Sequence, residues 1–348
     1  MIRIGMIGCG YWGPNLLRTL NEIDGAKVTK VSDVRPGRRE FVAKRYPGIE
    51  TCADAHDILK DGSVDAVVIA TPPDTHCALA LKALDQGKHV LVEKPLATST
   101  RDAESIVELA ARKSKTLLVG HLFLYAPPVL QIRSLLEQDH LGTVFCISSV
   151  RSNLGPPNTQ IDALWDLAPH DISMILHFMG EVPNQVTAHG AAFTNTRFAE
   201  TVFVTLRFPD GRMAHVHVSW LTPAKTRVMQ LIGSQRVLVY DDMQPVQKVM
   251  VYDPGVDNRV HAAEKNSAAL GFSPGGIWSP PLKTFEPLRA ECEDFLSSIQ
   301  TGKSPLSDGV RALEVVRVLE AASNSLRSGG QSTYASTELA ASSIGGGR

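Results

Sequence analysis

The sequence predicts an α/β amino-terminal domain built on a parallel sheet, followed by an α+β domain with a large, mostly antiparallel sheet. Up to residue 121, short apolar runs alternate with segments of helical periodicity, as in strands joined by crossover helices. From residue 142 onward, strand-like runs follow one another with turn residues between them. Because 348 residues exceed one ordinary core, we expect domains at residues 1–121 and 122–330, and a loose tail at residues 331–348.

Composition and charge exclude several classes of partner. Hydrophobic residues make up 43% of the chain and charged residues 20%, and the formal net charge of −1 gives no reason to expect nucleic acid or an acidic membrane. The most apolar region, residues 117–130, is interrupted by glycine, histidine and prolines, so no membrane span is expected. A signal peptide is not expected either, because Ile2 already begins a strand. Five scattered cysteines without a C-x-x-C pair suit a reducing cytoplasm and argue against structural zinc.

The first domain has regular alternation of strands and helices. We expect strands at residues 2–7, 26–33, 65–70, 90–92 and 116–121, and helices at residues 15–20, 41–46, 54–59, 77–86 and 98–113.

The first strand and helix enclose a G-x-G-x-x-G motif. Gly8 permits a tight turn, Gly10 lets a pyrophosphate approach the backbone, and Gly13 lets the helix lie close to the strand. The helix start offers free N–H groups to phosphates. This arrangement is typical of a Rossmann dinucleotide-binding domain, in which Tyr11 and Trp12 would line the loop.

An acidic residue follows the second strand at the spacing that this motif requires. Asp33 would hold the adenosine ribose hydroxyls and repel a 2′-phosphate, which favours NAD over NADP. Arg35, Arg38 and Arg39 follow and could hold that phosphate instead, so NADP stays an alternative. Asp33 could also be a helix N-cap.

The third strand runs into a proline-rich turn, Thr71-Pro72-Pro73-Asp74-Thr75-His76. A turn at this edge of the sheet would lie over the cofactor, so Thr71, Pro72 and His76 are candidate contacts to its pyrophosphate or ribose. His76 could equally be a polar residue in the first turn of the next helix.

The stretch that follows, His89-Val90-Leu91-Val92-Glu93-Lys94-Pro95, is a buried strand that ends in a carboxylate, an amine and a proline. Ligands of open α/β sheets bind beyond the carboxyl ends of the strands, so Glu93 and Lys94 would face the cofactor cleft. Pro95 ends the strand because it lacks an N–H. The alternative is a charged pair on a surface turn.

The second domain contains strand-like segments at residues 144–151, 185–190, 201–208, 213–220, 227–232, 237–240 and 248–252, and helices at residues 129–137, 169–179, 286–300 and 309–328. Residues 258–281 are expected to form a long loop. Arg151 and Asn153 would end one strand and could contact substrate, as could Tyr125 at the start of the domain. His215 and His217 alternate on one strand face, but we interpret them as structural because no third metal ligand is evident.

The order of these motifs along the chain resembles that of the Gfo/Idh/MocA oxidoreductases. The motifs are the glycine motif, Asp33, Thr71-Pro72-x-x-x-His76, Glu93-Lys94-Pro95 and Asp166-x-x-x-His170. The resemblance extends to about Gly330. The string Leu164-Trp165-Asp166-Leu167-Ala168-Pro169-His170-Asp171 is most similar to the nucleotide-sugar branch, such as UDP-N-acetylglucosaminuronate 3-dehydrogenases.

That resemblance implies an NAD(P)-dependent dehydrogenase acting on a ring hydroxyl of a sugar, inositol or nucleotide-sugar. It places the catalytic lysine at Lys94, a proline that is often cis at Pro95, and a second catalytic residue at His170, with Asp166 beside it. The paired glycines that many members carry before this aspartate are replaced here by Ala163-Leu164-Trp165. It also implies a substrate domain built on an open-faced sheet.

The chemistry of these residues fits alcohol oxidation. Removing a hydride and a proton needs a nicotinamide acceptor and a nearby base. Burial or a neighbouring cation can lower the pKa of a lysine enough for it to act as that base, and in the reverse direction an ammonium would stabilise a developing oxyanion. A histidine is a second proton carrier near neutral pH.

We therefore expect a cytoplasmic NAD-dependent dehydrogenase of a sugar, with a nucleotide-sugar at C3 favoured. The alternatives are an enzyme of free sugars or inositols, a ketoreductase working in reverse, an enzyme that uses its cofactor internally to hydrolyse or eliminate, and a non-catalytic dinucleotide-binding protein. An open sheet face would leave apolar surface uncovered in a monomer, so we expect a homodimer or homotetramer.

Overall fold

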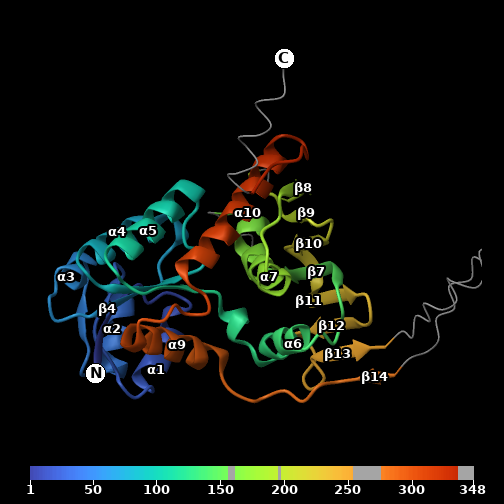
Figure 1. The fold of residues 1–348 in the computed structure, drawn as a ribbon. Coiled ribbons are helices and arrows are strands. Elements are labelled where there is room, and N and C mark those ends of the chain that lie inside the picture. Colours follow the sequence, from blue (N-terminus) through green and yellow to red (C-terminus); the bar gives the residue numbers. More distant parts are fainter. Residues whose placement is uncertain (156–160, 195–196, 254–275, 336–348) are drawn as a thin grey trace, which may run out of the picture. The chain divides into compact units, whose positions relative to one another are not determined.

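Two sheets organise the chain, one in each of two units of the computed structural model (Figure 1). The structure describes residues 1–155, 161–194, 197–253 and 276–335. The first unit comprises Met1–Ala126 and Phe285–Glu320, and the second comprises Pro127–Thr284 and Ala321–Arg348.

The sheet of the first unit is parallel throughout and has the order β3-β2-β1-β4-β5-β6. Its strands are β1 (Ile2–Ile7), β2 (Ala26–Ser32), β3 (Glu50–Cys52), β4 (Ala66–Ile69), β5 (His89–Glu93) and β6 (Leu117–Gly120). Every residue of β4 and β6 is buried, as expected for strands covered on both faces. This order is that of a dinucleotide-binding Rossmann domain, which confirms the predicted fold.

Helices follow these strands in the first unit. They are α1 (Gly13–Asn21), α2 (Pro36–Arg45), α3 (His56–Leu59), α4 (His76–Asp85), α5 (Thr100–Arg112) and α9 (Pro287–Thr301), with short 3-10 turns η1 (Pro73–Thr75) and η2 (Leu122–Tyr125). Helix α2 begins five residues before the expected start, because Pro36 supplies a backbone angle suited to a first turn.

The sheet of the second unit has the order β14-β13-β12-β11-β7-β10-β9-β8. Its strands are β7 (Val144–Leu154), β8 (Gln185–Ala191), β9 (Thr201–Arg207), β10 (Met213–Ser219), β11 (Leu221–Gly233), β12 (Val237–Asp241), β13 (Val249–Tyr252) and β14 (Ile277–Trp278). The β7–β10 pair is parallel and the other pairs are antiparallel. The mostly antiparallel sheet is therefore confirmed, and most of the expected 258–281 loop lies outside the described residues.

The second unit also contains α6 (Pro127–Glu137) and α7 (Ala163–Met179), while α10 (Gly309–Arg327) begins in the first unit and ends in the second. Helix α7 packs against β7, β9 and β10. The prediction that it begins at Pro169 was wrong. The Asp162 side chain accepts a hydrogen bond from the Trp165 N–H and caps the helix six residues earlier, with Pro169 accommodated inside.

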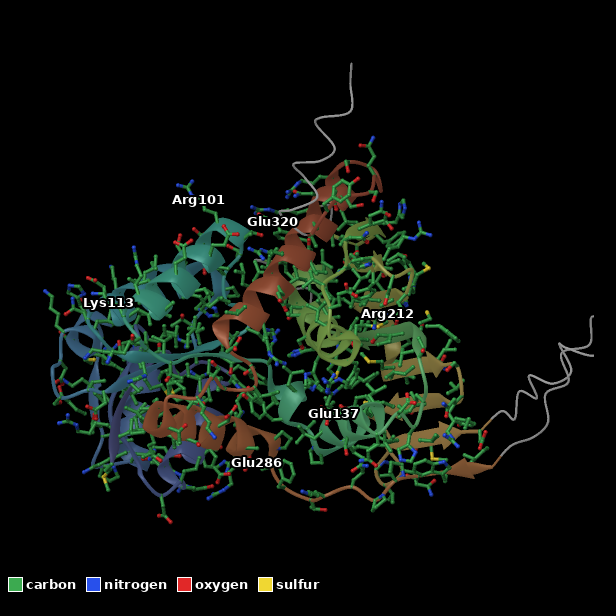
Figure 2. The ribbon with its side chains drawn as sticks, in the orientation of Figure 1. Arg101, Lys113, Glu137, Arg212, Glu286 and Glu320 are labelled. Carbon is green, nitrogen blue, oxygen red and sulfur yellow. The ribbon has the colours of Figure 1, made fainter. Side chains whose placement is uncertain are left out.

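The two units divide the chain differently from the expected boundary at residue 121. Residues 285–320, which we assigned to the second domain, belong to the first unit because α9 packs against α1 and η2. Glu286, labelled in Figure 2, is the N-cap residue of α9. Its carboxylate forms an ion pair with Arg18 of α1. Part of the expected loose tail is ordered, since the Thr333 backbone exchanges hydrogen bonds with Val186 of β8.

All five cysteines are free thiols, and three of them are only partly buried. Within the described ranges, no helix has the length and apolar character needed to cross a membrane.

Candidate active site

The glycine loop after β1 has the geometry that a bound pyrophosphate requires. Gly8 has a φ of +90°, and a Cβ added there would lie 2.5 Å from the Ala70 carbonyl oxygen. A Cβ at Gly13 would lie 2.8 Å from the Gly8 carbonyl oxygen, so both positions require glycine for the fold itself. At Gly10 the nearest neighbour would be Arg35 Nη2 at 3.5 Å, so the fold does not demand glycine there. The space beside Gly10 fits a ligand.

Helix α1 begins directly after this loop. Trp12 is its N-cap residue, and no side chain in the described ranges caps its first turn. Its N–H groups can therefore bind phosphate oxygens. Tyr11, in the same loop, is 93% exposed, so its ring is available to a ligand.

Asp33 stands at the end of β2, beside the loop. One of its carboxylate oxygens accepts a hydrogen bond from the Cys9 N–H and the other from the Arg35 N–H, each at 2.9 Å, and the Arg35 guanidinium donates to both oxygens. Burial alone would raise the pKa of Asp33, but these donors outweigh it and lower the pKa to about 2. Arg35, not Asp33, is the N-cap residue of α2, so the helix-cap alternative was wrong.

The arginines after Asp33 differ in their contacts. Arg35 neutralises Asp33, and Arg39 donates to the carbonyl oxygens of Asp33 and Val34. Arg38 lies in the first turns of α2, near enough to the loop for its charge to lower the Cys9 pKa, although burial of that thiol raises it more. A carboxylate already bound to arginine repels a 2′-phosphate less than a bare one.

The proline-rich turn after β4 is tied to the end of β5 by His76. Its Nδ1 lies 2.7 Å from the Pro95 carbonyl oxygen and its Nε2 lies 2.9 Å from the Thr71 carbonyl oxygen. Burial lowers the pKa of His76, so a neutral ring donates to only one of these carbonyls. This geometry favours the structural alternative for His76, which holds Thr71 and Pro72 at the carboxyl edge of the sheet. Thr71 also shares a hydrogen bond with Thr75.

Glu93 ends β5 at the same edge, and Lys94 follows it. Burial raises the pKa of Glu93 to about 7, against the opposing effects of the Lys94 charge and the Trp12 side chain. Gly120 of β6 pairs with Glu93, and a Cβ there would lie 3.0 Å from Glu93 Oε2, so the bare glycine makes room for the carboxylate. The Lys94–Pro95 peptide bond is cis. The close packing of the Glu93 carboxylate against Gly120 argues against an ordinary charged surface turn.

Tyr125 forms structural contacts within the first unit. Its ring is buried, and its hydroxyl donates to Asp294 of α9 at 2.8 Å and lies 3.0 Å from the Ser307 hydroxyl. The hydroxyl therefore joins segments of the first unit, and substrate contact by Tyr125 stays a prediction.

In the second unit, Asp166 and His170 lie one turn apart on α7, so they share a helix face. The Trp220 indole N–H donates to the Asp166 carboxylate at 3.1 Å. Both α7 side chains are partly buried. The predicted approach of His170 to Lys94, which belongs to the first unit, stays a prediction.

Arg151 lies inside β7, and Asn153 stands one residue before the end of the strand at Leu154. Arg151 is 3% exposed and forms a buried ion pair with Asp171 of α7, whose other oxygen accepts from Ser149. Its guanidinium thus fixes α7, and with it His170, on the sheet. Substrate contact by Arg151 or Asn153 stays a prediction.

His215 and His217 occupy the outer face of β10, and both stack on Phe203 of β9, with ring centroids 6.2 Å and 4.2 Å away. His215 also lies 3.3 Å from the Thr205 hydroxyl. No group of three metal-ligating side chains occurs among the described residues. These contacts fit the structural interpretation of both histidines.

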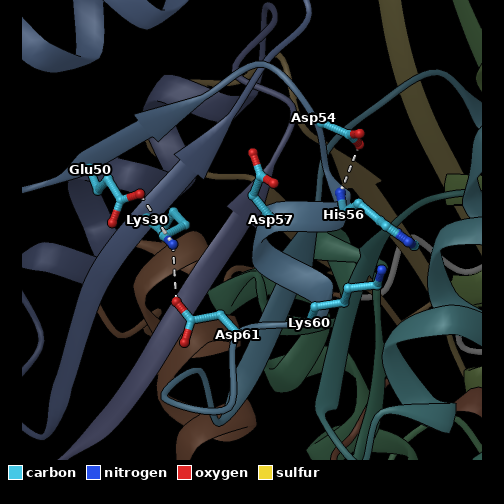
Figure 3. Close-up of a pocket in the computed structure, with 7 residues that line it drawn as sticks. All are labelled: Lys30, Glu50, Asp54, His56, Asp57, Lys60 and Asp61. Atoms are coloured by element: carbon cyan, nitrogen blue, oxygen red, sulfur yellow. Dashed lines mark hydrogen bonds and ion pairs between the residues drawn. The ribbon is translucent and has the colours of Figure 1, made fainter.

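An open hollow lies away from the loop, beside β3 and α3 (Figure 3). Its volume is about 520 Å³ and its lining is charged. Lys30 forms ion pairs there with Glu50 and Asp61. None of the predicted site residues lines it, so we do not assign it to the site.

Two buried titratable groups of the first unit were missed from the sequence. His121, directly after β6, is 2% exposed, and burial and the Lys94 charge lower its pKa to about 3. Glu291 of α9 is 0% exposed. A signal for Glu291 was present, because it interrupts the apolar stripe formed by Leu288, Cys292 and Phe295.

Comparisons with known proteins agree with this geometry. Residues 2–121 match the profile described as "Oxidoreductase family, NAD-binding Rossmann fold", and residues 129–239 match the GFO/IDH/MocA C-terminal domain.

Among similar proteins, inositol 2-dehydrogenase 2 of Saccharopolyspora erythraea is 31% identical over 62% of this chain and 66% of its own length. The 2,7-anhydro-N-acetylneuraminate hydratase of Escherichia coli is 31% identical over 62% of this chain and 60% of its own length. The matched region therefore covers less than two thirds of the length of each of these two relatives. UDP-N-acetylglucosamine 3-dehydrogenase of Acidithiobacillus ferrooxidans is 26% identical over 90% of this chain and 94% of its own.

A solved structure of that last enzyme superposes with a TM-score of 0.81 at 25% identity, covering 94% of this chain and 98% of its own. The matched ranges correspond to the parts of the chain that form the parallel sheet and most of the mostly antiparallel sheet. The chain belongs to the Gfo/Idh/MocA family of NAD-binding oxidoreductases.

Proposed function

We propose that this protein is an NAD-dependent dehydrogenase that oxidises a secondary ring hydroxyl of a sugar. The observation that carries the proposal is Lys94 at the carboxyl edge of the parallel sheet, next to Glu93 and in the unit that contains the glycine loop. A nucleotide-sugar oxidised at C3 is the favoured substrate, because the UDP-N-acetylglucosamine 3-dehydrogenase match extends over nearly the whole of both chains. Inositols and free sugars are the alternatives, supported by the inositol dehydrogenase relative.

The residues of the first unit suit NAD. The loop at Gly10 and the start of α1 would hold the pyrophosphate, and the ionised Asp33 would accept hydrogen bonds from the adenosine ribose. Glu93 would hold the second ribose. The bound nicotinamide supplies a hydride acceptor.

Proton transfer is assigned to Lys94 and His170. As a neutral amine, Lys94 would accept the hydroxyl proton while the hydride leaves the same carbon. His170 would be the second proton carrier, and Asp166 one turn earlier would orient it or bind a sugar hydroxyl. In the reverse direction, an ammonium at Lys94 would stabilise the oxyanion formed from a ketone.

The direct test is substitution of Lys94. Lys94→Ala should reduce NADH formation on a panel of UDP-sugars, free sugars and inositols on the order of 10²- to 10⁴-fold, because the base is lost while the phosphate loop is untouched. NAD affinity measured by calorimetry should change little. Lys82→Ala, at an exposed position of α4, removes a comparable charge and serves as the control.

A Lys94→Ala enzyme that turns over at the wild-type rate would remove Lys94 from the mechanism. NAD binding without turnover of any sugar would instead favour a non-catalytic dinucleotide-binding protein. The hydratase relative supports a second candidate, in which the cofactor is used internally. Product formation without net NADH accumulation would identify that activity.

The assembly and compartment are also proposals. The outer face of the second sheet exposes Phe203, Met213 and Ile232, which register pairing places on the same side. Such a face supports a homodimer or homotetramer. Five free thiols support a cytoplasmic location.

A further inference from the structure

Asp33 is covered by the side chain of a residue two places further along the chain. The Asp33 side chain is only 3% exposed, and the Arg35 side chain that contacts it is 56% exposed. The guanidinium donates from Nε to one carboxylate oxygen and from Nη2 to the other, each at 2.9 Å. Such a two-pronged contact is the strongest that an arginine and a carboxylate form. A ligand therefore reaches the Asp33 carboxylate only when the guanidinium moves away.

The acceptor capacity of the Asp33 carboxylate is already fully used. Its two oxygens offer about four lone-pair positions. The Cys9 N–H and the Arg35 N–H each take a position on a different oxygen, and the Arg35 side chain takes the other two. The two backbone donors belong to the glycine loop and to the N-cap of α2, so they leave only if the main chain moves. The two side-chain donors leave by rotation about single bonds.

The guanidinium lies where an adenosine ribose would approach Asp33. A Cβ built on Gly10 would lie 3.5 Å from Arg35 Nη2, so this side chain reaches from the start of α2 to the phosphate loop. A ribose whose two hydroxyls donate to Asp33 needs two acceptor positions on the carboxylate. Those are the positions that the guanidinium holds, so the ribose and Arg35 compete for them.

A phosphate on the 2′ oxygen of the ribose changes this competition. A guanidinium carries five N–H donors, and the pairing with Asp33 uses two of them. Phosphate oxygens accept from the other donors, so a 2′-phosphate is bound by Arg35 without separating it from Asp33. NAD has to displace the guanidinium from Asp33, and NADP does not.

We propose that Arg35 sets the cofactor preference, because its guanidinium occupies the ribose position on Asp33 and is an internal competitor of NAD. The paired guanidinium obstructs a 2′-hydroxyl and binds a 2′-phosphate. This assignment rests on the proposed function only for dinucleotide binding, and it does not involve Lys94 or the sugar. Removing the positive charge of Arg35 should therefore tighten the binding of NAD, although NAD is an anion.

Calorimetric titration of the full chain with NAD and with NADP tests the competition. Arg35→Ala should tighten NAD binding about 3- to 10-fold, because the ribose no longer has to displace a bound guanidinium. The same variant should weaken NADP binding at least about 10-fold, because the donors to the 2′-phosphate are lost and a bare carboxylate faces it. The two backbone donors to Asp33 remain in this variant. Unchanged or weaker NAD binding in Arg35→Ala would overturn the proposal.

Two further variants separate competition from charge alone. Arg45→Ala removes the same charge from an exposed position in the last turn of α2 and should leave the ratio of the NAD and NADP dissociation constants unchanged. Arg35→Lys keeps the charge but lacks the planar fork, so it should tighten NAD binding by a smaller factor than Arg35→Ala. Wild-type NAD affinity in Arg35→Lys, together with weaker NAD binding in Arg35→Ala, would show that Arg35 acts by attraction and would contradict the assignment.

The 2′-deoxy analogue of NAD shows which part of the cofactor competes. This analogue lacks one of the hydroxyls that would take over Asp33, so Arg35→Ala should tighten its binding less than that of NAD. An equal gain for both ligands would place the effect of Arg35 outside the ribose position and refute the proposal. Tighter NAD binding in Arg35→Ala without turnover of any sugar would support the role of Arg35 and count against the dehydrogenase, so the two proposals fail separately.

Discussion

The three glycines of the phosphate loop serve different purposes at the residue scale. Gly8 and Gly13 are required by backbone neighbours within 3 Å of an added Cβ, whereas Gly10 faces space that the protein does not fill. A glycine kept where the fold does not need it is best explained by the ligand that approaches it.

We therefore predict that Gly10→Ala will lower NAD affinity at least 10-fold while changing the free energy of unfolding by less than about 1 kcal/mol. Gly8→Ala should destabilise the protein by more than about 2 kcal/mol, because its φ is positive and its Cβ would clash with Ala70. Calorimetry and urea unfolding measure the two effects. Gly62→Ala, where an added Cβ meets nothing within 4 Å, is the control. Unchanged NAD affinity in Gly10→Ala would contradict this assignment of the loop.

Residues with a positional signature could be identified from the sequence. Gly8, Asp33 and Lys94 each stand at a fixed offset from a strand, and the structure places all three at the carboxyl edge of the first sheet. Glu291 carries no such offset. Its burial depends on α9 packing against α1 and η2, which lie far earlier in the chain, and local periodicity does not reveal such packing.

At the scale of elements, α7 shows how a helix that carries a proposed catalytic side chain is anchored. Its polar surface meets β7 through the buried Arg151–Asp171 ion pair, next in sequence to His170. Breaking a buried pair leaves one charge without its partner, which costs about 3–5 kcal/mol.

We predict that Asp171→Ala will lower the free energy of unfolding by about 3–5 kcal/mol for that reason. Arg151→Ala should lower the free energy of unfolding by a similar amount. If Arg151 were solely a substrate ligand, its loss would raise KM and leave the stability unchanged. Arg227→Ala, which breaks a more exposed pair with Asp242, should cost about 1 kcal/mol or less and is the control. Denaturant titration compares the variants, and a wild-type midpoint for Arg151→Ala would refute the anchoring role.

Element types were predicted better than their ends. The strands of the second sheet were identified from β-branched runs between turns, with bounds within a few residues for most of them. The start of α7 was not identified, because Pro169 is typical of a first turn and the Asp162 cap seven residues earlier gave a weaker signal. The short strand β3 was missed because three residues show no periodicity.

At the scale of the whole molecule, the outer face of the second sheet determines the expected assembly. We predict that Phe203→Glu will shift the protein toward monomer in size-exclusion chromatography with light scattering, because it places a charge in an apolar interface. Met243→Glu, in the turn between β12 and β13, changes an equally exposed apolar residue away from that face and should leave the mass unchanged. A wild-type protein that is monomeric at all concentrations would exclude the homo-oligomer.

The first unit is discontinuous in sequence, and this has a consequence during synthesis. Helix α9, which buries Cys292 and Phe295 against α1 and η2, is translated only after the entire second sheet. A nascent chain ending near residue 126 therefore presents an uncovered apolar flank as it leaves the ribosome. Until α9 emerges, that flank is a natural client surface for chaperones, and a truncated amino-terminal fragment would share its tendency to aggregate.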